Sequence, residues 1–468
     1  MAASGADTAD NLALLIDLYQ LTMAAAYFAG GVTATATFSF FVRAYPADRG
    51  YLVAAGLEDV VRFLTTFRFT PDALQHLRRS RLYRDDFLDF LEQLRFSGDV
   101  WALPEGSLCF VSEPLIEVTA PIIEAQLVET YLINQMNLQT MIATKAARCV
   151  HAAAGRSLID FSLRRVHGSD AGMKVARASY VVGFTGSSNV LAEQRYGIPA
   201  FGTMAHSYVE SFTDEIDAFR TFVQVFPSHS TLLVDTYDTL SGVRKAAIVG
   251  AEMRARGQRL GGVRLDSGDL DVLSRGARRI LDAAGLSEVK IFASGGLDEY
   301  QVAELVARGA PIDAFGVGTA MGVSSDAPFL DCAYKLVEYA GRPRLKLSKK
   351  KQTLVGRKQV WRAYDGSGVM HADVIGLRDE ARETIAPQLG VAAEHVQPCL
   401  LPVMRGGQLI APLPGLQAIR ARFAAEFARL PAPHKALRAP AAYPVRISTE
   451  LQRRQAAAAA AVRAQVTE

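Results

Sequence analysis

The sequence lacks the features that mark secreted, disulfide-rich and membrane-spanning proteins. Its 468 residues include four cysteines, which stand far apart and form no CxxC pair, so neither a zinc site nor a disulfide framework is expected. No apolar run reaches the length of a membrane span. The first ten residues are small and polar without a cationic start, unlike a signal peptide. These absences favour a cytoplasmic protein with no membrane partner.

An excess of charge of either sign is also missing. The chain has 51 Lys and Arg against 48 Asp and Glu, a formal net charge of +3. Without a Lys/Arg-rich arm or interleaved basic and aromatic residues, no nucleic-acid partner is expected. Hydrophobic residues are abundant, at 50% of the chain. A chain of this length and composition can form two or three domains with a large core.

The middle of the chain alternates short apolar runs with helical segments. From residue 157 onward the runs are SLIDFSL, IPAFG, STLLVDT, LGGVRLD, VKIFASG and IDAFGVG. Such alternation predicts parallel βαβ units, here closed into a barrel. We expect an N-terminal region over 1–135, the barrel over 136–330 and a C-terminal region over 331–468. The two outer regions are predicted to pack together as one α+β domain.

The outer regions show mixed patterns. Lys349, Lys350 and Lys351 predict a solvated loop. The other expected elements are a buried helix over 12–28, a strand over 34–43, helices over 57–94, short strands over 99–120, one long helix over 121–154, two strands over 331–347 and an alanine-rich helix over 451–468.

Polar residues and glycines follow all six apolar runs. In an α/β barrel the carboxyl ends of the strands form one mouth, where active sites lie. We therefore expect one site there. Its candidate residues are Arg164 and Arg165; Thr203 and His206; Asp235 and Asp238; Arg264, Asp266 and Asp269; Ser294, Gly295 and Gly296; Gly316, Gly318 and Thr319.

The chemistry of these strand ends leaves several possibilities open. Glycine turns on late strands suit a phosphate, although they could be ordinary tight turns. Arg264 could grip a planar carboxylate, or form a buried salt bridge with Asp266. The carboxylates could bind Mg²⁺ or a sugar's hydroxyls, and His206 could be structural or a general acid/base. The pattern predicts a barrel enzyme acting on a phosphorylated sugar with Mg²⁺.

With these motifs assembled, the sequence resembles the nicotinate phosphoribosyltransferases. The matching segments follow the family order from about residue 12 to 450. They are DLYQLTM (17–23), DFSLRR (160–165), GFTGSSNVLA (183–192), GTMAHS (202–207), LLVDTYDT (232–239), GVRLDSGDL (262–270), SGGLDE (294–299), FGVGT (315–319) and KLSKKKQTLVGRKQVWR (346–362).

The resemblance implies a type II phosphoribosyltransferase fold, an incomplete α/β barrel with an α+β domain built from both chain ends. It implies that nicotinate and 5-phosphoribosyl-1-pyrophosphate react to give nicotinate mononucleotide and pyrophosphate, coupled to ATP hydrolysis and assisted by Mg²⁺. This is the entry of nicotinic acid into NAD salvage. Because the family's tyrosine comes from the partner subunit, a homodimer is also implied.

The resemblance further assigns roles to individual residues. His206 matches the histidine that ATP phosphorylates. Tyr19 and Phe161 match the aromatic pair around the pyridine ring, and Arg264 with Thr203 matches the group that binds nicotinate. Asp235 and Asp266 match carboxylates near the ribose and Mg²⁺. The phosphate-binding residues that the resemblance implies are Arg164, Gly295, Gly296, Gly318 and Thr319, and the pattern of the two glycine turns adds Ser294 and Gly316 to them.

Other activities of this fold remain as alternatives. The related nicotinamide enzyme has an aspartate where Ser188 stands here, and a carboxylate at that place would repel nicotinate. Transfer to nicotinamide or to quinolinate is the nearest alternative. A barrel aldolase would need a lysine at a strand end, where none is found. An inactive scaffold should have lost some of His206, Arg264 and Asp266, and all are present.

Overall fold

A computed structural model describes residues 12–347 and 353–467. The chain forms two compact units. The barrel unit spans Met141–Pro328, and the terminal unit joins the residues up to Thr140 with those from Phe329 onward. The sequence-based boundaries stand at 135/136 and 330/331. The lysine loop expected at 349–351 lies outside the described residues.

The barrel unit is built on a six-stranded parallel sheet. Its order is β7-β6-β11-β10-β9-β8, so β7 and β8 are edge strands and the sheet does not close on itself. Val263, Ile291 and Phe315 in its central strands are completely buried, as expected where helices cover a parallel sheet. The predicted incomplete α/β barrel is confirmed. The strands are β6 Ser157–Asp160, β7 Gly186–Ser187, β8 Thr231–Leu233, β9 Gly262–Leu265, β10 Lys290–Ala293 and β11 Ala314–Val317.

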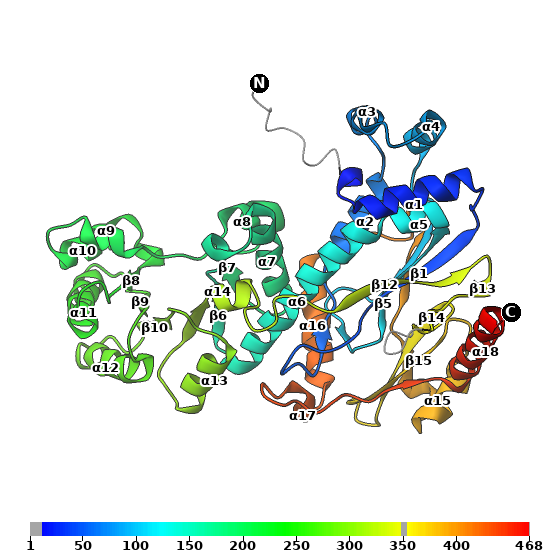
Figure 1. Cartoon of the computed structure of the whole chain (residues 1–468). Coiled ribbons are helices and arrows are strands. Elements are labelled where there is room, and N and C mark those ends of the chain that lie inside the picture. The colour runs from blue at the N-terminus through cyan, green and yellow to red at the C-terminus, as the bar shows by residue number, and fades with distance from the viewer. Residues whose placement is uncertain (1–11, 348–352, 468) are drawn as a thin grey trace. The chain divides into compact units, whose positions relative to one another are not determined.

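Helices follow most of these strands, and α11 and α12 pack against β9 and β10 (Figure 1). The carboxylates of Asp238, Asp269 and Asp298 accept backbone N–H groups at the first turns of α11, α12 and α13, which stabilises these helix starts. The elements are η2 Leu163–Arg165, α7 Ser169–Val181, α8 Val190–Tyr196, α9 His206–Glu210, α10 Glu215–Val225, η3 Pro227–His229, α11 Thr239–Ala255, α12 Leu270–Ala283, α13 Glu299–Ala307 and α14 Thr319–Gly322.

The expectation of a buried strand at IPAFG is wrong. Only Ala200 forms an isolated bridge, to Ser187. Pro199 has no N–H to donate, and its carbonyl accepts from Ser187 while Phe201 N–H donates back to the Ser187 carbonyl. Phe201 is also 41% exposed. The segment is therefore an extended edge beside β7, and the preceding Gly186–Ser187 supplies the strand.

The terminal unit is α+β, and its largest sheet joins both ends of the chain. β1 (Thr35–Val42) pairs antiparallel with β5 (Pro114–Pro121) and with β12 (Cys332–Tyr339) (Figure 1). The predicted domain built from both chain ends is thereby confirmed. The sheet order is β13-β12-β1-β5-β3-β17-β18, with β3 Asp99–Ala102, β13 Arg342–Pro343, β17 Leu401–Arg405 and β18 Gln408–Leu409.

Two smaller sheets complete this unit. β2 (Leu52–Val53) pairs with β4 (Leu108–Cys109). The other sheet has the order β16-β14-β15-β19, with β14 Lys358–Tyr364, β15 Met370–Leu377, β16 Val396–Pro398 and β19 Val445–Ile447.

The helices of the terminal unit depart from expectation at two places. The segment 12–28 is not one buried helix but η1 (Leu12–Leu14) and α1 (Leu18–Ala29), and Leu18 is 61% exposed. The helix expected over 121–154 is divided at Val128 into α5 (Ile122–Leu127) and α6 (Glu129–Ala153). The others are α2 Leu57–Thr66, α3 Pro71–Ser80, α4 Asp85–Gln93, α15 Arg382–Leu389, η4 Ala393–His395, α16 Leu416–Arg429, α17 Ala432–Lys435 and α18 Thr449–Thr467.

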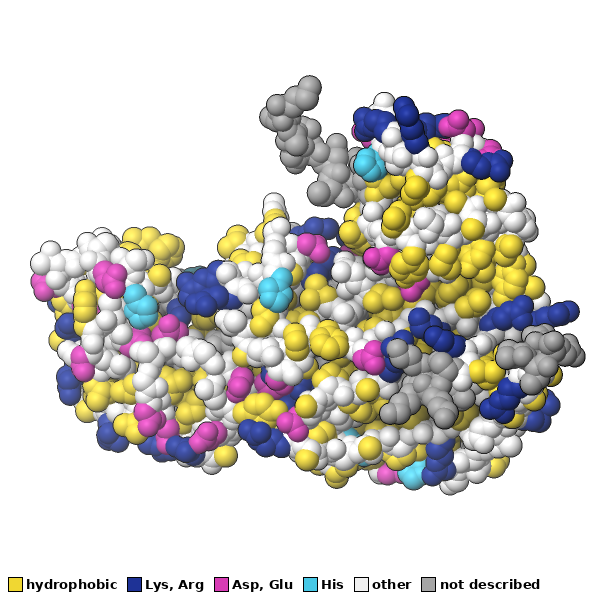
Figure 2. Space-filling view, in the orientation of Figure 1, with side chains coloured by type: hydrophobic (Ala, Val, Ile, Leu, Met, Phe, Trp, Pro, Cys, Tyr) yellow, Lys and Arg dark blue, Asp and Glu magenta, His cyan; other side chains and the backbone are white. Residues whose placement is uncertain are grey.

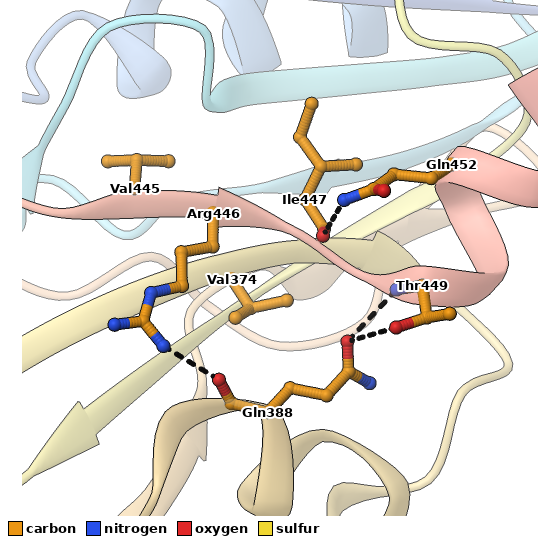
Figure 3. Close-up of a pocket in the computed structure, with 7 residues that line it drawn as sticks. All are labelled: Val374, Gln388, Val445, Arg446, Ile447, Thr449 and Gln452. Atoms are coloured by element: carbon orange, nitrogen blue, oxygen red, sulfur yellow. Dashed lines mark hydrogen bonds between the residues drawn. The ribbon is translucent and has the colours of Figure 1, made fainter.

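The surface of the terminal unit is charged over α3 and α4 (Figure 2). There Arg78 forms ion pairs with Asp85 and Asp89. Such exposed pairs contribute little to stability. Within the described residues, no helix combines the length and the hydropathy needed to cross a membrane.

Candidate active site

A cavity of about 590 Å³ opens at the carboxyl ends of the barrel strands. Fifteen residues are given a catalytic, nicotinate-binding or phosphate-binding role from the sequence, Ser188 included. The cavity brings together thirteen of them, although they come from segments between residues 161 and 319. They are Phe161, Arg164, Ser188, Thr203, His206, Arg264, Asp266, Ser294, Gly295, Gly296, Gly316, Gly318 and Thr319. Tyr19 and Asp235 are not among the residues that line it.

Arg264 is held in the cavity wall by three side-chain hydrogen bonds. Its Nε–H donates to Ser294 Oγ (2.8 Å), one Nη1–H to Thr203 Oγ1 (3.3 Å), and one Nη2–H to Asp266 Oδ1 (2.8 Å). The guanidinium lies 5.2 Å from the centre of the Phe161 ring. Each terminal nitrogen keeps one N–H for a ligand. Arg264 can therefore form the salt bridge with Asp266 and bind a ligand carboxylate at the same time, although the sequence presented these two roles as alternatives.

Asp266 is held in its ionised form. Burial alone would raise the pKa of this carboxyl, but the Ser294 hydroxyl and the Arg264 guanidinium outweigh that effect and lower the pKa below its ordinary value. The Ser294 hydroxyl is therefore occupied by Asp266 and Arg264, and its predicted contact with a phosphate stays a prediction. An ionised carboxylate beside the cavity can stabilise positive charge that develops on a substrate.

Asp235 lies behind this pair rather than in the cavity wall. Its Oδ2 accepts the Asp266 N–H (3.0 Å) and the Ser267 hydroxyl (2.5 Å). Its Oδ1 is buried and has no hydrogen-bond partner among the described residues. A buried carboxylate oxygen without a donor is unfavourable, so this atom is suited to a cation.

His206 is the first residue of α9 and points both nitrogens at polar groups. Nδ1 lies 3.2 Å from Thr236 Oγ1, and Nε2 lies 3.7 Å from Asp266 Oδ2. The side chain is 41% exposed, so a ligand in the cavity can reach it. Thr236 was not singled out from the sequence, because its contact with His206 depends on how α9 is placed beside the end of β8.

The Phe161 ring is positioned by a glycine. A Cβ on Gly316 would lie 2.7 Å from the ring carbon Cδ2 of Phe161, and the ring also packs at 5.6 Å from Phe292. Gly316 therefore has a packing reason to be glycine, beside its predicted role at a phosphate. The Phe161 ring thus forms part of the cavity lining, with the Arg264 guanidinium over it.

The turn after β10 disfavours a side chain at Gly295 by lack of space and at both of its glycines by backbone conformation. Gly295 and Gly296 have φ of +99° and +71°, and a Cβ on Gly295 would lie 1.9 Å from the Asp266 carbonyl oxygen. Such left-handed conformations favour glycine and turn backbone N–H groups toward a common point. The turn is thus suited to an anion, as the sequence predicted.

The remaining predicted residues differ in whether they reach the cavity. Arg164 lies in η2 and, like Arg165, is exposed along the cavity. Asp238 and Asp269, predicted as charges of the mouth, instead cap α11 and α12. Tyr19 belongs to α1 of the terminal unit and is 49% exposed.

The protein-family comparison covers most of the chain. Three family models match: the nicotinate phosphoribosyltransferase (NAPRTase) N-terminal domain over residues 14–137, the NAPRTase family over 156–364, and the nicotinate phosphoribosyltransferase C-terminal domain over 357–455.

Similar proteins agree with these matches. Nicotinate phosphoribosyltransferase pncB2 of Mycobacterium tuberculosis is 50% identical over 398 residues, 85% of this chain and 83% of the relative. The human nicotinate phosphoribosyltransferase is 34% identical, with 94% and 95% covered. The crystal structure of human nicotinic acid phosphoribosyltransferase superposes with a TM-score of 0.83 at 32% identity, covering 94% of this chain and 99% of that one.

The predicted family is confirmed by the three family models and by relatives that match over nearly the whole chain. The cavity lies within the segment that the central model matches. The chain belongs to the nicotinate phosphoribosyltransferase family.

Proposed function

We propose that the protein transfers the phosphoribosyl group of 5-phosphoribosyl-1-pyrophosphate to nicotinate, forming nicotinate mononucleotide and pyrophosphate, with ATP hydrolysis coupled through a phosphohistidine at His206. The observation that carries this proposal is the cavity itself. It combines an aromatic face, an arginine with two N–H groups left for a ligand, and glycine turns suited to a phosphate.

Nicotinate fits the Phe161–Arg264 wall. Its flat ring stacks on Phe161, and its carboxylate accepts the remaining N–H groups of Arg264, a charge-assisted pair of hydrogen bonds. Thr203 and Ser294 hold the guanidinium from the other side, so the arginine loses little freedom when the ligand binds. The 5-phosphate binds at the turn of Gly295 and Gly296.

The reaction breaks the bond between ribose C1 and pyrophosphate and forms a bond from C1 to the ring nitrogen. Positive charge develops on the ribose, where the ionised Asp266 stabilises it. Negative charge develops on the leaving pyrophosphate, where Arg164 and Arg165 are the exposed cations of the cavity. Phosphorylated His206 orders the substrates, and its hydrolysis shifts the overall equilibrium toward the product.

The residues present fit Mg²⁺. No group of three or more His, Cys, Asp or Glu side chains within the described residues is close enough to hold a metal alone. Magnesium is commonly held by one or two carboxylates together with substrate phosphates, and the carboxylates available for it are Asp266, which lines the cavity, and Asp235, whose Oδ1 is unpartnered among the described residues. When bound there, the ion would neutralise charge on the pyrophosphate.

A homodimer completes the proposal, with Tyr19 reaching the partner's cavity to cover the second face of the pyridine ring. Tyr19 is half exposed on α1, and Leu15 and Leu18 beside it are 50% and 61% exposed. Hydrophobic side chains gather over α1 on the visible face (Figure 2). An exposed apolar group of this kind is typical of a protein–protein contact.

The test is a product assay with ATP, 5-phosphoribosyl-1-pyrophosphate and either nicotinate or nicotinamide, with mass spectrometry of the protein. We expect nicotinate mononucleotide, ADP in proportion to it, and phosphate on His206. His206→Ala should abolish the phosphate and the ADP but keep slow transfer. His229→Ala, which changes an exposed histidine outside the cavity, is the control.

Two results would refute the proposal. Equal turnover of nicotinamide would assign the protein to the alternative activity of the same fold. ATP consumption that stays proportional to product in His206→Ala would show that this histidine does not carry the phosphoryl group.

A further inference from the structure

Asp160 is a buried carboxylate below the cavity, at the end of β6. Only 1% of the residue is exposed. Its Oδ1 accepts the N–H (2.9 Å) and the hydroxyl (2.5 Å) of Ser162, and its Oδ2 accepts the hydroxyl of Ser187 (2.8 Å). Its backbone carbonyl also accepts the N–H of Ser188 (2.8 Å). One residue is thus bonded through its side chain to the segments that follow two neighbouring strands, β6 and β7, which also pair through their backbones.

These two segments supply different parts of the cavity wall. Ser162 lies in the chain between Phe161, whose ring lines the cavity, and η2, which carries Arg164. Ser187 precedes Ser188, which lines the cavity at the place predicted to distinguish an acid from an amide. The Ser187 hydroxyl oxygen also accepts the Asn189 N–H (3.1 Å), so the whole turn is fastened to Asp160.

The surroundings of Asp160 give the carboxylate no cation of its own. Its partners among the described residues are hydroxyl and amide groups. Burial raises the pKa of this carboxyl, and the hydrogen bonds from Ser162 and Ser187 offset only part of the rise. An apolar side chain would avoid this penalty. A carboxylate is explained here by the hydrogen bonds that it makes to both segments.

We propose that Asp160 is a positioning residue that sets the distance between the Phe161–Arg164 segment and the Ser188 turn, and thereby both the fit of the pyridine ring and the choice between carboxylate and amide. The inference rests on the proposed function, because it concerns the binding of nicotinate. Asp160 itself does not line the cavity and acts through its neighbours.

The contacts of Asp160 with the two segments can be removed one at a time by single serine substitutions. Ser187→Ala removes the bond to the turn, so the preference for nicotinate over nicotinamide should fall about tenfold while KM for 5-phosphoribosyl-1-pyrophosphate stays within about twofold. Ser162→Ala loosens the segment that carries Phe161 and Arg164, so KM should rise about tenfold for both substrates. Both changes keep the Cβ and leave the packing intact.

Asp160→Asn tests the residue itself, because the amide keeps the shape and removes the charge. We expect both effects together. The control is Asp313→Asn, which alters an aspartate that accepts from Lys290 Nζ and the Ile291 N–H just before β11, at the other end of the strands. Steady-state kinetics with both bases and the melting temperature are measured for the wild type and all four variants.

The outcomes separate the two proposals. A folded Asp160→Asn with the wild-type KM values and base preference would overturn the role of Asp160 and leave the proposed function standing. Variants that lose kcat in proportion to their lost stability, with KM and preference unchanged, would reduce Asp160 to a structural residue. A wild type that transfers nothing to nicotinate would overturn the proposed function, and this inference with it.

Discussion

Replacing Arg264 by lysine tests whether the cavity recognises a carboxylate by geometry or merely by charge. Lysine keeps the positive charge but replaces a planar fork with a single ammonium group. Arg264 makes three hydrogen bonds in the cavity wall, to Ser294, Thr203 and Asp266, and an ammonium cannot keep all three while still binding a ligand. We therefore expect the shorter side chain to be drawn toward Asp266.

The size of the effect follows from the bonds lost. Nicotinate would lose at least one charge-assisted hydrogen bond, and a bond to a charged group is worth about 1.5–3 kcal/mol. KM for nicotinate should rise about ten- to hundredfold, with a much smaller change for 5-phosphoribosyl-1-pyrophosphate. The rise is measured by steady-state kinetics of nicotinate mononucleotide formation.

The comparison with nicotinamide makes the experiment decisive. The amide carries no charge, so its slow turnover should change far less in Arg264→Lys, and the discrimination between the two bases should shrink. Arg308→Lys is the matched control, because Arg308 is an exposed arginine in an ion pair with Glu304. An unchanged KM for nicotinate in a folded Arg264→Lys protein would refute the assignment of Arg264.

Three further changes test other parts of the structure. Ser188→Asp should lower kcat/KM for nicotinate at least about tenfold and raise that for nicotinamide, because a carboxylate a few ångströms from the ligand repels the acid; turnover ratios with the two bases check this. Gly316→Ala should raise KM for nicotinate and destabilise the protein by about 1–3 kcal/mol, because the new Cβ would meet the Phe161 ring at 2.7 Å; kinetics and denaturant unfolding measure the two effects. Glu113→Gln should stabilise the protein more at high pH than at low pH. Burial and the nearby Asp373 raise the pKa of Glu113 well above its ordinary value, so the folded state binds the proton more tightly than the unfolded state does. The wild type therefore loses stability as the pH rises from the unfolded pKa toward the folded pKa, by about 1.4 kcal/mol per pKa unit. Melting temperatures of wild type and variant are measured from pH 5 to pH 8, and a constant difference between them over this range would refute the prediction.

The fold could be predicted from the sequence where local pattern and tertiary structure agree. The runs around Val263, Ile291 and Phe315 are apolar because the strands are buried on both faces, and this pattern is visible without a structure. IPAFG has the same composition but lies at an edge with a proline, so its apolar character misleads. Phe201 is exposed because its segment lies at the edge of the sheet, and the order of apolar and polar residues in the sequence does not reveal that position.

Prediction of the site from the sequence also succeeds only where the signal is local. The pattern of strand ends predicts Asp238 and Asp269 as charges of the mouth, yet each caps the first turn of a helix. An aspartate just before a helical segment is a capping signal that the sequence does contain. Asp160 and Thr236 could not have been found in this way. Asp160 bonds to Ser187, 27 residues away, and Thr236 to His206, 30 residues away, through pairings that exist only once the sheet and its loops are formed.

The charges of the cavity suggest why phosphoryl transfer to His206 and binding of pyrophosphate would be linked. His206 Nε2 lies 3.7 Å from Asp266 Oδ2, and Asp266 is ionised because Ser294 and Arg264 lower its pKa against the effect of burial. Two unit charges of the same sign at about 4 Å repel by about 4 kcal/mol at an effective dielectric constant of about 20. On the proposed mechanism, a phosphate on His206 therefore needs a cation beside it. Arg264 is already bonded to Asp266, which leaves the exposed Arg164 and Arg165, with the proposed Mg²⁺, as the compensating charges. On the proposed mechanism the same groups would receive the pyrophosphate, so occupation of one anionic position would change the electrostatic field at the other. This shared set of cations would then be a physical basis for coupling ATP hydrolysis to phosphoribosyl transfer.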